Sequence, residues 1–95
     1  MRVEYSRRAV AELRKISADS QRTFGDRVAE ALEARIRAVI DRISREPLSA
    51  PGVEQRPGLH VVPLIRYPFK VFYRVLDDRV RILHIRHTAR RPWQG

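Results

Sequence analysis

The stretch Tyr67-Pro-Phe-Lys-Val-Phe-Tyr-Arg-Val-Leu-Asp-Asp-Arg-Val-Arg-Ile-Leu-His-Ile-Arg-His87 decides the fold of this chain. It contains two runs rich in Val, Ile, Phe and Tyr, separated by the polar pair Asp77-Asp78. Such runs on either side of a short polar turn are typical of a β-hairpin. Turn chemistry accounts for the two carboxylates, so we assign them no catalytic role. The hairpin is predicted to form the centre of a sheet.

The two faces of this hairpin differ in chemistry, because side chains alternate between the faces of a strand. Five apolar side chains are predicted to point together into a core and so fix the register: Val71, Tyr73, Val75, Leu83 and Ile85. The opposite face then carries Lys70, Arg74, His84 and Arg86, mixed with Phe72 and Ile82. A face that combines cations with an aromatic ring is a candidate docking surface. The alternative is that Lys70 and Arg74 only keep an exposed sheet face soluble.

The chain has 95 residues, which predicts a single domain, residues 1–95, with one core of two layers. It has 20 Lys and Arg residues against 11 Asp and Glu, for a net charge of +9, and nearly all of the cations are arginine. A chain this basic predicts a polyanion or an acidic protein as partner, and charge alone does not choose between them. Arginine favours planar, bidentate contacts with phosphate or carboxylate.

Several chemistries are excluded or unexpected. The absence of cysteine excludes disulfides, thiolate nucleophiles and thiolate-bound zinc. His84 and His87 fall on opposite faces of a predicted strand, so we expect no shared metal ion, and we expect no cofactor. The start of the sequence lacks the apolar core of a signal peptide, and no run is long enough to cross a membrane. We therefore expect a cytoplasmic protein without a membrane partner.

The N-terminal half predicts a strand followed by a first helix. Residues 2–5 have a strand pattern, and Ser6 is a candidate N-cap for the helix that follows. The apolar residues of this helix fall three apart: Val10, Leu13 and Ile16. The pattern weakens over residues 19–25, and Gly25 is the predicted break between two helices.

The second helix is the longest regular element in the prediction. It begins near Asp26, and its apolar residues recur at three- and four-residue steps: Val28, Leu32, Ile36, Val39, Ile40 and Ile43. We expect this stripe to face the core. Pro47 ends the helix, because the residue before a proline is pushed out of the helical conformation. Residues 48–58 predict an irregular loop, and residues 59–66 a strand with Pro63 at a bulge or an edge.

The order of these elements predicts an α+β fold. A short N-terminal strand precedes an antiparallel helical hairpin, and three further strands complete a small, mainly antiparallel sheet (β-α-α-β-β-β). The helical hairpin is expected to pack on one face of the sheet. The face that bears the cations then lies away from the helices, without a protein layer of its own.

The sequence resembles the RelE/ParE superfamily, the toxin components of type II toxin-antitoxin systems. The resemblance covers nearly the whole chain. It rests on the strand and two helices at the start, on Gly25 and Pro47, and chiefly on the block Phe69-Lys-Val-Phe-Tyr-Arg-Val-Leu-Asp-Asp-Arg-Val-Arg-Ile-Leu-His-Ile-Arg-His87. It implies the α+β fold described above and a growth-inhibiting toxin that is silenced by a cognate antitoxin.

One branch of the superfamily implies DNA gyrase as the target. ParE-like members act on gyrase, and the run Arg86-His-Thr-Ala-Arg-Arg-Pro-Trp93 resembles the His-x-x-Arg ending common among them. Target binding in this branch requires a shaped, charged surface and no catalytic group. The residues that the resemblance implies for it are Arg74, Arg86, His87, Arg90, Arg91 and Trp93.

The other branch implies a ribosome-dependent mRNA endonuclease, so the resemblance leaves open whether the chain is an enzyme. RelE-like members cut mRNA in the ribosomal A site with basic residues on the exposed sheet face. Lys70 and Arg90 match two of those basic positions. No tyrosine follows Tyr73, so the C-terminal tyrosine often used in this branch is absent. His84 or His87 could replace it, since an imidazole with a pKa of about 6.5 suits proton transfer; we take His87 as the candidate.

Either branch implies an antitoxin partner that is small, acidic and DNA-binding, in a toxin-antitoxin hetero-oligomer. An acidic amphipathic helix would bury Phe72 and neutralise Arg74 and Arg86, beside His84. A third possibility, from another class, is a non-toxic basic domain that binds nucleic acid without sequence preference and in a salt-sensitive manner.

Overall fold

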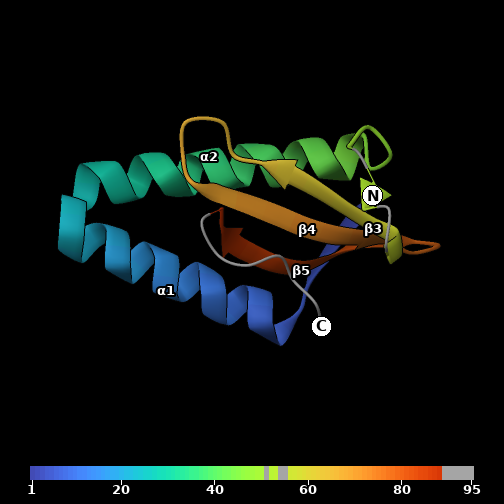
Figure 1. Ribbon diagram of the computed structural model, residues 1–95, viewed down its shortest axis with the longest axis horizontal. Helices are drawn as coiled ribbons and strands as arrows, with labels where there is room; N and C mark the ends of the chain where they lie inside the picture. Colours follow the sequence, from blue (N-terminus) through green and yellow to red (C-terminus); the bar gives the residue numbers. More distant parts are fainter. Residues whose placement is uncertain (51, 54–55, 89–95) are drawn as a thin grey trace.

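The computed structural model describes residues 1–50, 52–53 and 56–88 of the chain. Figure 1 shows two long helices packed beside a twisted sheet. In chain order the described elements are β1 (Arg2–Tyr5), α1 (Arg7–Phe24), α2 (Asp26–Arg45), β2 (Gly52–Val53), β3 (Arg56–Pro63), β4 (Phe69–Val75) and β5 (Arg79–His87). The predicted α+β fold, with its N-terminal strand and helical hairpin, is confirmed.

The strands form one sheet in the order β1-β5-β4-β3-β2. β1 runs parallel to β5, and the other pairings are antiparallel. The short strand β2 was not predicted, and β3 begins at Arg56, inside the predicted loop. β3 ends at Pro63, where a missing N–H interrupts the ladder least. Within the described residues, no helix combines the length and the apolar character that crossing a bilayer requires.

Local signals fix where the helices begin and end. Ser6 Oγ accepts a hydrogen bond from Ala9 N at 3.0 Å and donates one to the Leu83 carbonyl at 2.8 Å, so it both caps α1 and ties it to β5. Gly25 has a φ of +90°, which L side chains disfavour. α1 continues through residues 19–24, where its apolar pattern weakens, and it ends at Phe24, directly before Gly25. α2 ends at Arg45, as Pro47 predicts.

The core lies between the helical hairpin and one face of the sheet. Its buried members are Ala9, Leu32, Ile36, Val39, Ile40, Ile43, Leu64, Val71, Tyr73, Val80, Ile82 and Ile85. The predicted stripe of α2 is confirmed except at Val28, which is 39% exposed. Val28 lies in the first turn of α2 and borders a groove described below, and Ala29 is buried in its place.

A β-bulge in the central hairpin changes which side chains of β5 are buried. The register pairs Phe72 with His84 but Tyr73 with Ile82, so Leu83 is an extra residue on β5. Ile82 is fully buried in the core, and Leu83 is only partly buried. The predicted placement, with Leu83 inside and Ile82 outside, is therefore wrong, because an extra residue reverses the alternation on one side of it.

Candidate functional site

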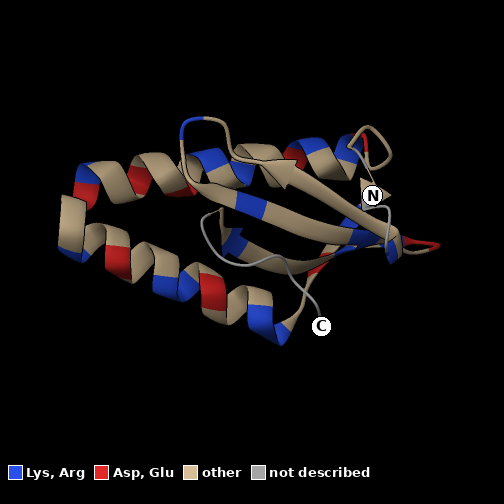
Figure 2. Cartoon of the chain, in the orientation of Figure 1, with Lys and Arg blue, Asp and Glu red and all other residues tan. Residues whose placement is uncertain are grey.

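Three cations, Lys70, Arg74 and Arg86, lie on the side of the sheet that points away from the helices, and we call them the cationic face. Their neighbours Val71 and Ile85 are in the core, so alternation places the cations on the other side, as expected. Figure 2 shows Lys and Arg positions on both β4 and β5. The register sets Lys70 directly opposite Arg86. Like charges at such positions destabilise a sheet.

Two further arginines on this side of the sheet, Arg79 and Arg81, are already paired with an acid. Arg81 Nη2 lies 2.7 Å from Glu4 Oε1, and Arg79 Nε lies 2.5 Å from Glu4 Oε2. The hydrogen bond from Arg81 lowers the pKa of Glu4, and the charge of Arg79 acts in the same direction. None of the ion pairs among the described residues involves the three cations of the cationic face.

Two members of the cationic face are positioned by their neighbours. Arg74 Nη1 donates a hydrogen bond to the Pro57 carbonyl at 3.1 Å. Gly58 leaves room for this contact, since a Cβ there would be 3.1 Å from the same nitrogen. Lys70 Nζ lies 5.9 Å from the ring centroid of Phe72, within cation-π range. The side chains of Arg74 and Lys70 are therefore held in position by contacts within this chain, without a bound partner.

Phe72 and His84, which the mixed apolar and basic surface led us to predict as antitoxin contacts, lie on the same side of the sheet as these cations. Their rings pack edge to face with centroids 6.4 Å apart. Phe72 is 8% exposed and His84 is 5% exposed. The aromatic surface that the sequence led us to expect on this face is therefore largely buried.

A carboxylate from α1 reaches His84 at the edge of β5. Glu12 Oε1 accepts a hydrogen bond from Ile85 N at 3.0 Å and lies 3.6 Å from His84 Nδ1. Burial lowers the pKa of His84; the charge of Glu12 opposes this shift, and the charges of Arg86 and Arg8 add to it. His84 is therefore neutral at pH 7 and adds no charge to the cationic face.

His87 lies on the helix-covered side of the sheet. Its register partner is Phe69, and their ring centroids are 5.4 Å apart, whereas Lys70, the next residue of β4, points to the opposite side. The sheet thus separates Lys70 from His87, two residues proposed for catalysis. The described residues hold no cluster of His, Asp or Glu that could bind a metal ion. The predictions for three further residues fall outside the described part of the chain: Arg90, Arg91 and Trp93.

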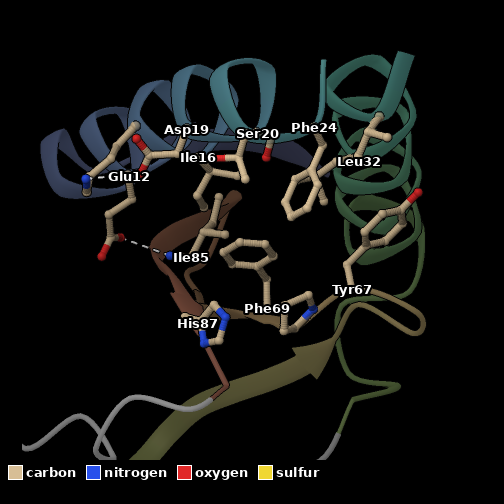
Figure 3. Close-up of a pocket in the computed structure, with 14 residues that line it drawn as sticks. Glu12, Ile16, Asp19, Ser20, Phe24, Leu32, Tyr67, Phe69, Ile85 and His87 are labelled. Carbon is tan, nitrogen blue, oxygen red and sulfur yellow. Dashed lines mark hydrogen bonds and ion pairs between the residues drawn. The ribbon is translucent and has the colours of Figure 1, made fainter. Parts of the chain in front are cut away.

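An apolar groove opens between the helical hairpin and the ends of β4 and β5, and we call it the hairpin groove (Figure 3). Its volume is about 660 Å³. Figure 3 shows the rings of Phe24 and Phe69 pointing into it, and Phe24 is 68% exposed. On its rim, Lys15 Nζ pairs with Asp19 at 3.1 Å. Apolar surface left open in this way is typical of an interaction site.

Comparison with known proteins assigns the chain to a family. A family model described as the ParE toxin of the type II toxin-antitoxin system parDE matches residues 3–92. The chain belongs to the ParE toxin family. As a ParE-family chain, it is the toxin component of a type II toxin-antitoxin system, in agreement with the resemblance seen in the sequence.

Among the solved structures that share the fold of this ParE-family chain are two toxin-antitoxin systems and one toxin. The chromosomal ParDE toxin-antitoxin system of P. aeruginosa aligns with a TM-score of 0.79 at 24% identity, covering 92% of this chain and 95% of that chain. The E. coli RelBE toxin-antitoxin complex gives 0.63 at 19% identity, covering 95% and 98%. A YoeB/ParE toxin from Agrobacterium tumefaciens gives 0.66 at 16%, covering 92% and 98%. No curated protein sequence matches the chain.

Two surface features of the ParE-family chain were missed in the sequence. Arg79 and Arg81 were not assigned to the cationic side, although their alternation with the buried Val80 and Ile82 carries that signal. No local pattern in the sequence predicts the hairpin groove, because its walls come from both helices and from segments that are distant in sequence.

Proposed function

We propose that this ParE-family toxin inhibits DNA gyrase, and so replication, and that a cognate antitoxin silences it. One observation carries the choice of target. Among the residues that the structure describes, neither candidate histidine is accessible beside Lys70, because His87 points to the opposite side of the sheet and His84 is 5% exposed. A toxin that binds a protein target needs a shaped, charged surface and no such group, whereas RNA cleavage needs one.

The proposed target surface begins at Arg74 and Arg86 of the cationic face. Their charge is not balanced by an acid among the described residues, so it is available to an anionic surface. The sequence resemblance adds three residues near the C-terminus to this surface: Arg90, Arg91 and Trp93. It also implies His87, but that side chain lies on the helix-covered side of the sheet and is not part of the cationic face.

The proposed partner is a small, acidic, DNA-binding antitoxin in a cytoplasmic hetero-oligomer with the toxin. A net charge of +9 favours an acidic partner. Two of the structural relatives are described as a ParDE toxin-antitoxin system and a RelBE toxin-antitoxin complex. The cationic face is one place where carboxylates of such a partner would be stabilised.

Induction of the chain without its antitoxin tests the target. We expect plasmid supercoiling to fall and the SOS response to rise, with unchanged mRNA 5′ ends. New 5′ ends in translated mRNAs, with normal supercoiling, would instead support the endonuclease. That alternative is favoured by Lys70 and Arg86, which stand side by side as phosphate binders would. Salt-sensitive mobility shifts of nucleic acid without any toxicity would point to a simple binding domain.

Substitutions separate the two toxin mechanisms further. Replacing Arg90 and Trp93 by Ala is expected to abolish toxicity if gyrase is the target, because both belong to the proposed target surface. Lys70→Ala is expected to leave most toxicity intact, and Lys15→Ala is the matched control. A toxin that survives the first change and loses its activity with Lys70→Ala would act by RNA cleavage.

A further inference from the structure

A second groove lies along α2, against the end of β3, and we call it the α2–β3 groove. Its walls include Val39 and Ile43 of α2 and Val61 and Pro63 of β3, and Ile65 borders it from the turn that follows. Its volume is about 230 Å³, below the roughly 300–1,000 Å³ of small-molecule pockets. A space of this size suits one or two anchoring side chains of a macromolecular partner.

The described charges around this groove are of one sign. Arg35 and Arg42 border it, and none of its described lining residues is acidic. The two are separated by two helical turns, about 10.5 Å along the helix axis. Both are exposed, and neither takes part in the ion pairs found among the described residues. Two arginines thus flank an apolar floor with their charge unbalanced.

The groove also presents apolar surface that the fold itself does not use. Ile65 is 67% exposed in the turn between β3 and β4. The next residue, Arg66, has a φ of +83°, a conformation that costs free energy for a side chain other than glycine. In the described register β2 pairs with β3 at Arg56 and His60, so β3 has no strand paired to its outer edge beyond His60.

The hairpin groove differs from the α2–β3 groove in the charges at its rim. Its rim includes Glu12 and Asp19, and Asp19 is paired with both Lys15 and Arg22. Lys15 is the one Lys or Arg among the described residues of that rim, and it is already paired with Asp19, so the hairpin groove offers an acidic segment no unbalanced cation. An acidic segment with apolar residues therefore fits the α2–β3 groove and not the hairpin groove.

The geometry points to the α2–β3 groove as the docking site of an acidic, partly apolar segment of the antitoxin. Its carboxylates pair with Arg35 and Arg42, and an apolar side chain packs against Ile65. The inference rests on the proposed function, in which an antitoxin silences this chain. Because the groove shares no residue with the cationic face, a toxin altered in the groove keeps its toxicity and escapes its antitoxin.

The test measures binding and growth with the full chain. The probe is the purified cognate antitoxin, to be identified as the product of a small acidic reading frame beside the toxin gene. Charge reversal by R35E/R42E is expected to raise the Kd of the complex by about tenfold or more, since two charge pairs become repulsive. The matched control, R14E/R37E, changes net charge equally at exposed arginines that border neither groove.

A third variant, Ile65→Ser, removes apolar contact without changing charge, and it is expected to weaken binding as well. Thermal unfolding of each variant checks that the fold is intact, as the exposure of these side chains predicts. Equal weakening by R35E/R42E and R14E/R37E would show that binding depends on net charge alone, and it would overturn the inference that this groove is the docking site. Unchanged binding by R35E/R42E would overturn it as well. Failure of the unaltered chain to bind the antitoxin would contradict the proposed function itself.

Discussion

The two faces of the central hairpin come from the same strands and differ in what their side chains do for stability. On the helix-covered face, Tyr73, Val80 and Ile82 are fully buried. On the cationic face, Lys70 stands opposite Arg86 and opposes folding slightly. Along one strand, residues that point to the helices stabilise the fold, and the residues that alternate with them belong to the face proposed to bind the target. Substitutions on the two faces should therefore separate folding from toxicity.

The largest effect is expected on the buried face. Ile82→Ala should lower the free energy of unfolding by about 2–5 kcal/mol, because it leaves a cavity in a packed core. Denaturant unfolding measures the loss. Leu83→Ala is the control, and it should cost clearly less because the bulge leaves Leu83 partly exposed. A larger loss from Leu83→Ala would contradict the register described for β5.

A smaller loss is expected at the edge of β5, where α1 meets the hairpin. Glu12→Ala removes the acceptor of the Ile85 N–H and should lower the free energy of unfolding by about 1–3 kcal/mol. Glu12→Gln keeps an acceptor oxygen and should cost less. Equal losses in chemical unfolding of the two variants would show that this hydrogen bond contributes little.

The buried side chain of His84 is expected to make the free energy of unfolding depend on pH. Its pKa is lower in the folded chain than in the unfolded chain, so the unfolded chain binds the proton more tightly. Stability from neutral His84 is complete above about pH 6.5 and is lost as the pH falls from there through the folded pKa. Unfolding at pH about 7.5 and about 5.5 should show a larger decrease for the unaltered chain than for His84→Gln. Identical decreases would mean that His84 does not titrate differently on folding.

The smallest effect is expected on the cationic face. Lys70→Gln removes one of two opposed like charges and should raise the free energy of unfolding by a few tenths of a kcal/mol. Lys15→Gln is the control, because Lys15 pairs with Asp19 at an exposed site and its loss should lower stability slightly or leave it unchanged. A clear loss of stability from Lys70→Gln, measured by urea unfolding, would show that this cation stabilises the fold.

Much of the fold could be predicted because its signals are local. Ser6, Gly25 and Pro47 mark helix ends through one hydroxyl, one backbone conformation and one missing N–H, and the structure has each helix end where they predict. The cations of β4 could be placed for the same reason, since alternation needs only the strand itself. The buried state of Phe72 and His84 could not be predicted, because it depends on neighbours that are distant in sequence.

The amino-acid sequence by itself determined the order of strands and helices apart from β2, the apolar stripe of α2 apart from Val28, and the excess of positive charge, because each follows from residue type and spacing along the chain. Only the tertiary structure decided the bulge at Leu83, the pairing of Glu4 with Arg79 and Arg81, and the two grooves. Each of these depends on the distance between segments that meet only when the helices pack on the sheet, and no local pattern encodes such a distance.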